Sequence, residues 1–261
     1  MRVSRDHETE FDSIVLGVGG MGSATCYELA RRGLKVLGLD RFPLVHDQGS
    51  SHGETRIIRK AYFEHPDYVP LLHRSYERWH DLERLTGREL LLPVGLVMSG
   101  PPEGETIRGA RLSADRYGLE LQNFTSGKAN ERFSGFAFPE DHEVAFEPGA
   151  GMLLIEDCVQ AYVDQAKRCG ADLRGGEPAI EWMSDGNTVR VRTQLQEYTA
   201  KSLVITAGPW ANDFLADIGI DLTVLRKFVG WFPVRTDQYL VRSGFPTYFF
   251  ELPHGSFYGF P

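Results

Sequence analysis

Near the start of the chain, two short apolar runs flank a segment in which apolar residues recur at helical spacing. The first run, residues 13–18, is uninterrupted, which is typical of a strand buried on both faces. Residues 22–33 follow with helical spacing and end on Gly33, a residue suited to the C-terminal end of a helix. The second run, residues 35–40, ends in an acid. This order predicts a strand–helix–strand unit.

The rest of the chain alternates between helical and extended patterns. Residues 67–87 carry an apolar stripe at helical spacing and close on Gly87, so they predict an amphipathic helix. Residues 156–170 predict a second helix by the same signals. Residues 188–194 alternate like a half-exposed strand, and residues 202–208 form another short apolar strand.

Extended patterns also occupy the middle and the end of the chain. Residues 89–100 predict strands broken at Pro93 and Gly95, whereas residues 101–148 mix a polar helix with aromatic-rich turns. The tail, residues 222–261, is strand-like and aromatic. Helices and strands are therefore intermixed along the whole chain, which favours the α/β class.

Composition and charge argue against nucleic acid and membrane as partners of this chain. The chain has 261 residues, of which 42% are hydrophobic and 25% charged, as in ordinary globular proteins. Its formal net charge of −8 argues against a nucleic-acid partner, which requires a basic face. No apolar run approaches the roughly 18 residues of a membrane helix, so we expect no membrane association. The three cysteines are scattered without a paired spacing, which favours a reducing compartment; a cytoplasmic location and no metal site are expected.

The sequence GVGGMG links the first strand to the first helix of the predicted unit. Gly17 allows a tight turn, Gly19 lets the backbone approach a pyrophosphate, and Gly22 lets the helix lie close to the strand. The helix N-terminus then offers N–H groups to phosphates. Asp40 follows Gly22 by 18 residues, close to the usual position of the acid that binds a ribose hydroxyl. A dinucleotide site is therefore predicted; Asp40 disfavours NADP but suits both NAD and FAD.

A second candidate site is the stretch HGETRIIRKAY, residues 52–62. Arg56 and Arg59 lie three positions apart with two isoleucines between them, and His52 precedes them. Within an acidic chain, such a cluster suggests a small anionic ligand rather than a polymer. Arginine pairs at this spacing more often lie on solvated surfaces, so the pattern alone leaves both interpretations open.

Five motifs in order carry a resemblance to a known family. They are FDSIVLGVGGMG, HGETRIIRKAY, FEPGAGML, AGPW and ELPHGSFYGFP. The chain resembles the monomeric sarcosine oxidase and N-methyltryptophan oxidase family of FAD-dependent amine oxidases over nearly its whole length. The resemblance implies FAD rather than NAD, because in such flavoproteins the chain returns to the nucleotide domain at the AGPW motif.

The resemblance also implies roles for individual residues. Arg59 matches the family arginine that binds the substrate carboxylate, a task suited to a planar, always charged guanidinium. Arg56 and His52 match positions beside the flavin ring, where a cation favours the reduced, anionic ring. Tyr258 matches a tyrosine of the substrate pocket. The residues expected to bind the cofactor are Gly17, Gly19, Gly22, Asp40, Ser50, Thr55 and Gly208.

The implied reaction is oxidation of a secondary amino acid, such as sarcosine or an N-methyl or cyclic amino acid. A hydride passes from the carbon next to nitrogen to the flavin, and molecular oxygen then accepts the electrons and leaves as hydrogen peroxide. One alternative is a flavin dehydrogenase that uses another acceptor. The other is a non-catalytic FAD-binding remnant, because the chain ends earlier than the family pattern and is expected to be truncated at its C-terminus.

The expected architecture is a Rossmann-like FAD-binding domain, residues 11–91 and 152–221, and an antiparallel-sheet substrate domain, residues 92–151 and 222–261. Both domains are discontinuous in sequence. Lys60 stands where many relatives have histidine, which leaves the identity of the amine substrate open. None of the three cysteines stands where the family attaches its flavin, so no covalent link is assigned.

Overall fold

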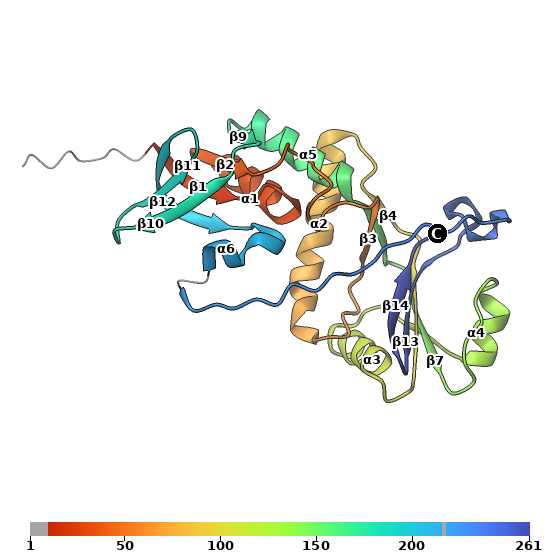
Figure 1. The fold of residues 1–261 in the computed structure, drawn as a ribbon. Coiled ribbons are helices and arrows are strands. Elements are labelled where there is room, and N and C mark those ends of the chain that lie inside the picture. Colours follow the sequence, from red (N-terminus) through yellow and green to blue (C-terminus); the bar gives the residue numbers. More distant parts are fainter. Residues whose placement is uncertain (1–9, 216–217) are drawn as a thin grey trace, which may run out of the picture. The chain divides into compact units, whose positions relative to one another are not determined.

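The computed structural model describes residues 10–215 and 218–261. The chain forms two compact units, each assembled from two separate stretches. The first unit comprises Met1–Glu54 and Ile155–Val229, and the second comprises Thr55–Leu154 and Gly230–Pro261. Both contain helices and sheets (Figure 1), which confirms the α/β class.

The first unit is built on a six-stranded sheet with the order β10-β11-β12-β1-β2-β9. Neighbours from β12 to β9 run parallel, whereas β10 and β11 form an antiparallel extension. Figure 1 shows the N-terminal strand β1 beside β12, which lies far away in the sequence. The strands are β1 (Phe11–Leu16), β2 (Val36–Asp40), β9 (Asp172–Gly175), β10 (Ala179–Ser184), β11 (Val189–Thr193) and β12 (Glu197–Ile205).

Both faces of the central strands are buried, as the apolar runs predict. Ile14 and Leu16 contribute to one hydrophobic cluster, whereas the intervening Val15 contributes to another. The second cluster is completed by α1 (Gly20–Ala30), through Cys26, and by α5 (Ile155–Arg168). Burial raises the pKa of the Cys26 thiol to about 12, so this cysteine behaves as an apolar core residue.

The second unit contains a five-stranded sheet, order β14-β13-β5-β7-β6, and a three-stranded sheet, order β3-β8-β4. In the larger sheet β13 and β5 are parallel and the other neighbours are antiparallel. The strands are β3 (Thr55–Ile58), β4 (Leu91–Leu92), β5 (Leu96–Gly100), β6 (Gln122–Thr125), β7 (Glu143–Glu147), β8 (Gly151–Leu154), β13 (Thr247–Leu252) and β14 (Gly255–Gly259). The helices are α2 (Val69–Thr86), α3 (Glu105–Tyr117) and α4 (Ser126–Arg132).

Alternation along β5 divides the core of the second unit between two faces. Leu96 and Met98 pack with Ile107 of α3, whereas Val97 packs with Ala129 of α4. The α4 side also gathers phenylalanine rings, such as Phe138, which stacks on a neighbour from β13. Each face of the sheet is therefore covered by one helix.

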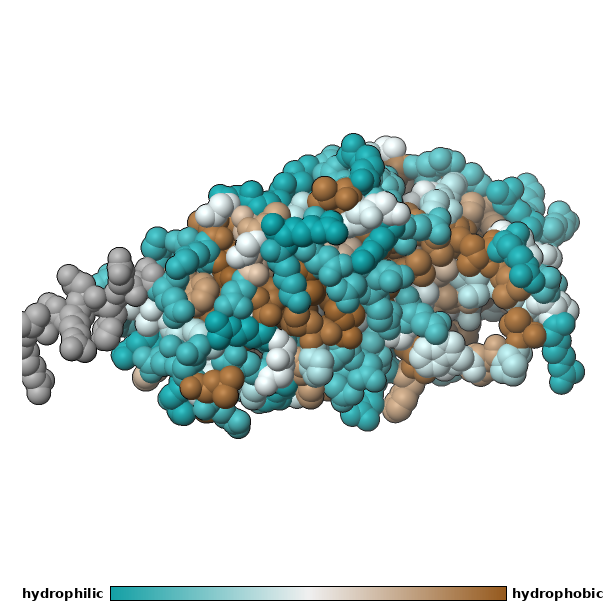
Figure 2. Space-filling model, turned by 90° about the horizontal axis from the view of Figure 1, so that it is seen from above, coloured by the Kyte–Doolittle hydropathy of each residue, from teal (hydrophilic) through white to brown (hydrophobic). Residues whose placement is uncertain are grey.

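The prediction that the tail, residues 222–261, is strand-like is wrong for residues 228–234. These residues form no helix or strand, and the side chains of Phe228 and Phe232 are 89% and 85% exposed. Hydrophobic side chains also appear among polar ones on the face drawn in Figure 2. An apolar, aromatic pattern favours a strand only where neighbouring strands pack against it. Among the described residues, no strand pairs with this segment. Conversely, β6 and β7 lie in a region where the sequence indicated only a helix and turns.

The structure assigns residues 55–91 to the second unit, although the sequence placed them with the FAD-binding domain. The functional division into two domains stays a prediction. No helix within residues 10–215 and 218–261 combines the length and apolarity needed to cross a bilayer. In the same residues, no group of three or more potential ligands could hold a metal ion.

Candidate functional site

The turn that follows β1 requires glycine at two positions. Gly17 has φ +90°, and a Cβ there would lie 2.5 Å from the carbonyl oxygen of Thr206. A Cβ on Gly22 would lie 1.8 Å from the carbonyl oxygen of Gly17. The first turn of α1 therefore packs directly against the backbone of the preceding turn, which no larger residue permits.

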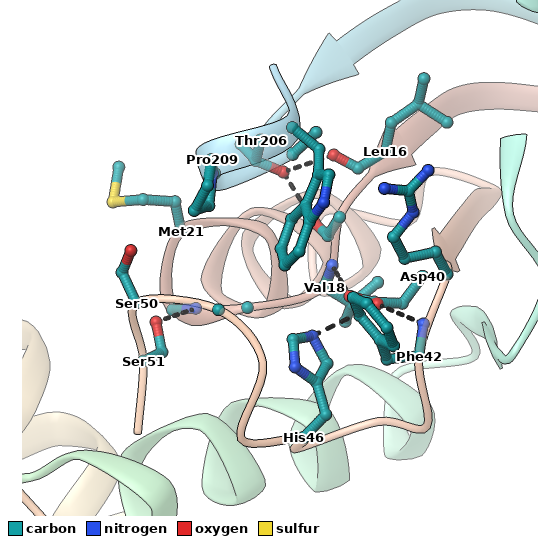
Figure 3. Close-up of a pocket in the computed structure, with 18 of the residues that line it drawn as sticks. Leu16, Val18, Met21, Asp40, Phe42, His46, Ser50, Ser51, Thr206 and Pro209 are labelled. Atoms are coloured by element: carbon teal, nitrogen blue, oxygen red, sulfur yellow. Dashed lines mark hydrogen bonds and ion pairs between the residues drawn. The ribbon is translucent and has the colours of Figure 1, made fainter. Parts of the chain in front are cut away.

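The N-terminus of α1 opens into a cavity of about 180 Å³ in the first unit (Figure 3). The cavity is lined by residues 16–21, 39–42, 49–51 and 206–210, with a few further side chains. The first turn of α1 contains no acidic residue, so nothing there offsets the positive end of the helix dipole. A cavity with backbone N–H groups and this dipole at one end suits an anionic group.

Asp40 lies at the cavity wall where β2 ends and is 5% exposed. One carboxylate oxygen accepts a hydrogen bond from the backbone N–H of Val18 at 2.7 Å. The other accepts from the N–H of Phe42 at 2.9 Å and lies 3.4 Å from Nε2 of His46 (Figure 3). These contacts hold the acid against the glycine turn.

Aromatic side chains form a further part of the wall. The ring of Phe42 lies 5.2 Å from that of Trp210 and 4.9 Å from that of His46. The guanidinium of Arg41 lies 5.4 Å from the Trp210 ring centroid. Flat rings and a cation beside a buried acid give this end of the cavity surfaces for stacking as well as for hydrogen bonding.

In the second unit, Arg59 follows β3 and is held by its neighbours in the chain. Its guanidinium carbon lies 4.4 Å from the ring centroids of both Tyr62 and Phe63. Nη2 donates to both carboxylate oxygens of Glu64, at 2.7 and 2.9 Å. The Arg59 side chain is 13% exposed, and its Nε is buried without a hydrogen-bond partner among the described residues.

The surroundings of Arg59 change the pKa of the neighbouring Tyr62 phenol, and they show how the guanidinium binds a carboxylate. Burial raises the pKa of Tyr62, and the nearby Glu64 carboxylate adds to the rise while Arg59 opposes it. A guanidinium clamped between two rings keeps its charge but loses most of its hydration. Glu64 shows that the exposed side of this group receives a carboxylate with two acceptor oxygens.

The comparison with family models covers almost the whole chain. Residues 12–261 match the family described as FAD dependent oxidoreductase. The chain belongs to this family. FAD as the cofactor and the class of oxidoreductase are thereby confirmed at the level of the family, as is the resemblance to the sarcosine oxidases.

Two curated proteins and one solved structure illustrate what this chain is similar to. The chain is 41% identical to monomeric sarcosine oxidase of Streptomyces avermitilis over 253 residues, or 96% of this chain and 66% of that protein. It is 32% identical to N-methyl-L-tryptophan oxidase of Yersinia pestis, over 97% of this chain and 67% of that protein. A variant of NikD, described as an unusual amino acid oxidase essential for nikkomycin biosynthesis, matches with TM-score 0.74 and 28% identity, over 82% of this chain and 55% of that chain. The chain thus spans about two thirds of the length of the curated relatives.

Most cofactor residues predicted for this FAD-dependent oxidoreductase lie together in the first unit. The cavity lining includes Gly17, Gly19, Asp40, Ser50 and Gly208. Gly22 lies one turn further along α1, where it allows the helix to pack on the turn. The backbone N–H of Gly20 donates a hydrogen bond to Oγ of Ser51 at 3.0 Å, a residue that the sequence did not single out.

The remaining predicted residues lie elsewhere. Thr55 begins β3 in the second unit, opposite Leu154. His52 belongs to the first unit but not to the cavity lining. Arg56 lies on β3, where its Nη1 donates to the carbonyl of Thr55 at 2.6 Å. The roles of these residues stay predictions.

Tyr258 lies on the edge strand β14, opposite Phe249, and is 44% exposed. Its ring meets that of Phe260 edge-on, with centroids 6.1 Å apart. That Arg59 and Tyr258 share a substrate pocket stays a prediction.

Several residues of the site escaped the sequence analysis. His46 and Phe42 lie in a loop without a periodic pattern, so nothing indicated that they reach the cavity. Trp210 stands in the AGPW motif, but the motif alone did not show that its ring faces Phe42. Glu64 follows the arginine stretch closely enough that its pairing with Arg59 could have been considered.

Proposed function

We propose that this chain belongs to an FAD-dependent oxidase of secondary amino acids, such as sarcosine or another N-methyl or cyclic amino acid. The observation that carries the proposal is Arg59, a cation clamped between two rings and already paired with a carboxylate. The identity to a monomeric sarcosine oxidase and to an N-methyl-L-tryptophan oxidase supports the substrate class.

The residues around the cavity of the first unit fit FAD. The backbone at Gly19 is open to the cavity. A Cβ added there would have only Ser51 Oγ within 4 Å, at 3.7 Å. Gly19 would hold the pyrophosphate through its backbone N–H group, and Asp40 would accept hydrogen bonds from a ribose. We therefore assign the first unit as the Rossmann-like FAD-binding domain and the second as the substrate domain.

Arg59 would bind the substrate carboxylate by replacing Glu64 as its partner. Both oxygens of Glu64 lie on Nη2, and the Glu64 side chain is 42% exposed, so its displacement into water costs little. Because the guanidinium is fixed by Tyr62 and Phe63, a bound carboxylate would have one orientation. This orientation would determine which carbon of the substrate is presented for oxidation.

In the proposed reaction the substrate amine first loses its proton. Bound FAD would supply the acceptor for a hydride from the carbon next to nitrogen, and the resulting imine would be hydrolysed by water. Molecular oxygen finally receives two electrons and two protons and leaves as hydrogen peroxide. Arg56 and His52 would supply positive charge beside the cofactor, and Tyr258 would line the substrate pocket.

The test is an anaerobic titration of the FAD-loaded chain with sarcosine and with pipecolate, followed by admission of air. We expect the flavin absorbance to bleach with substrate and one hydrogen peroxide to form per substrate oxidised. Bleaching without peroxide would show a dehydrogenase that uses another acceptor. No bleaching with any secondary amino acid would contradict the proposed activity and favour the non-catalytic remnant.

A further inference from the structure

Glu147 at the end of β7 makes contacts with the stretch that carries Arg59. Glu147 is 3% exposed. Oε1 accepts a hydrogen bond from the backbone N–H of Lys60 at 2.8 Å, and Oε2 accepts one from that of Ala61 at 2.9 Å. Both oxygens of one buried acid are thus used on the two consecutive peptides that follow the arginine.

Burying a carboxylate at this position costs desolvation free energy, which an apolar side chain would not. Burial raises the pKa of the Glu147 carboxyl, while the two N–H bonds and the charges of Lys60 and Arg59 oppose the rise. An apolar side chain of similar size would fill the space without desolvating a carboxylate. What an apolar residue could not provide is a pair of acceptors for these two backbone groups.

The stretch from Arg59 to Glu64 is anchored at its far end as well. Ser113 of α3 donates to the carbonyl of Tyr62 at 2.6 Å, and the ring of Phe63 lies 4.9 Å from that of Phe249. These contacts hold the two rings that clamp the guanidinium. Since Nε of Arg59 makes no hydrogen bond in the described part of the chain, the near end of the arginine depends on its backbone anchor.

We propose that Glu147 is a positioning residue for Arg59. Through the N–H groups of Lys60 and Ala61 it fixes the backbone from which the guanidinium extends between Tyr62 and Phe63. The inference rests on the proposed function, because it takes Arg59 as the carboxylate site. It adds that the affinity for the carboxylate depends on an acid that does not touch the substrate.

The first readout concerns the position of Arg59 and requires no substrate. In the FAD-loaded full chain, labelled with ¹⁵N at arginine Nε, the Arg59 signal is assigned by its absence in Arg59→Lys. The two rings should shift this signal away from those of exposed arginines. In Glu147→Gln, which preserves the side-chain size but offers one acceptor oxygen, we expect the signal to move toward the exposed values and broaden.

Glu83→Met, which removes both of its backbone contacts, is the control. Oε1 of Glu83 accepts hydrogen bonds from the N–H groups of Leu90 and Leu91, both at 2.9 Å, so it anchors two consecutive peptides in a stretch without Arg59. The Arg59 signal should be unchanged in this variant. An unchanged signal in Glu147→Gln, or an equal change in both variants, would overturn the proposal. Should Glu147→Gln fail to fold, Glu147→Asp, which keeps both acceptors on a shorter arm, should still displace the signal.

The second readout is anaerobic calorimetric binding of sarcosine and of dimethylamine, which lacks the carboxylate, to the chain with its flavin already reduced, so that neither ligand is oxidised. In Glu147→Gln we expect the sarcosine Kd to rise about tenfold, since a charged contact is misplaced, and the dimethylamine Kd to stay unchanged. An unchanged sarcosine Kd despite a displaced Arg59 signal would overturn the effect on affinity. If Arg59→Gln itself left sarcosine binding unchanged, the proposed function would fail, whereas the Arg59 signal would still decide whether Glu147 positions the side chain.

Discussion

The cavity of the first unit and the Arg59 stretch of the second unit rely on different chemical groups. One end of the cavity is formed by backbone, namely the glycine turn and the start of α1, and a carboxylate bonded to two backbone N–H groups lies at the wall. The Arg59 stretch is formed by side chains, namely a cation, two rings and an acid.

This difference decides which substitutions each region tolerates. A site made of backbone is sensitive wherever an added atom would meet a carbonyl, and less sensitive to the charge of its side chains. A site made of charged and aromatic side chains is sensitive to the loss of one group but not to small changes of volume. The following substitutions test that contrast, beginning with the largest expected effect.

Gly22→Val should have the largest effect. Its Cβ would lie 1.8 Å from the carbonyl oxygen of Gly17 and 2.7 Å from Oγ1 of Thr206, so α1 must move away from the turn. We expect a loss of roughly 3 kcal/mol in unfolding free energy and no retention of FAD after gel filtration. Gly127→Ala in α4 is the control, because a Cβ there meets nothing within 4 Å and should leave both properties unchanged. Full FAD retention by Gly22→Val would refute the backbone-built site.

Arg59→Gln tests the charge-built site. It removes the guanidinium from between Tyr62 and Phe63 and should raise the KM or Kd for sarcosine about 100-fold, while FAD retention stays the same. Arg74→Gln is the matched control, since Arg74 pairs with Glu77 on the exposed face of α2 and should affect neither property. An unchanged sarcosine Kd would remove Arg59 from the site.

Asp40→Asn should weaken FAD binding by about tenfold, because the amide leaves one of the two backbone N–H groups without an acceptor and removes the charge proposed to bind a ribose. The Kd is measured by fluorescence titration of the FAD-free chain. Asp12→Asn serves for comparison: Asp12 also accepts a backbone hydrogen bond, from Lys35 at 2.8 Å, but it lies at the other end of β1. Equal weakening by both would show that the effect is general rather than local.

Glu64→Gln should have the smallest effect, and in the opposite direction. Because Glu64 competes for the Arg59 guanidinium, its loss should tighten sarcosine binding about threefold, the size expected for a partly exposed ion pair. Anaerobic calorimetry on the chain with its flavin already reduced gives the Kd. Weaker binding would instead show that Glu64 orients the arginine rather than occupying its place.

The strand–helix–strand unit and its glycine turn could be predicted from the sequence because they are local. The apolar runs at residues 13–18 and 35–40 correspond to β1 and β2, and Gly17 has the positive φ that its turn requires. Adjacent residues build this part, so spacing along the chain reflects spacing in the fold. The pattern failed at residues 228–234, where apolar residues signal burial but no described strand lies alongside.

The sequence by itself determined the family, the class of fold and the glycine turn with its acid. Only the tertiary structure decided that His46 and Trp210 reach the cavity wall and that Glu147 meets Lys60, 87 positions away. The motif FEPGAGML was visible in the sequence, yet nothing in it indicated what its acid bonds. The physical reason is that local backbone preferences are encoded in neighbouring residues. Contacts between distant side chains arise only when the pairing of strands such as β3 and β8 brings their ends together.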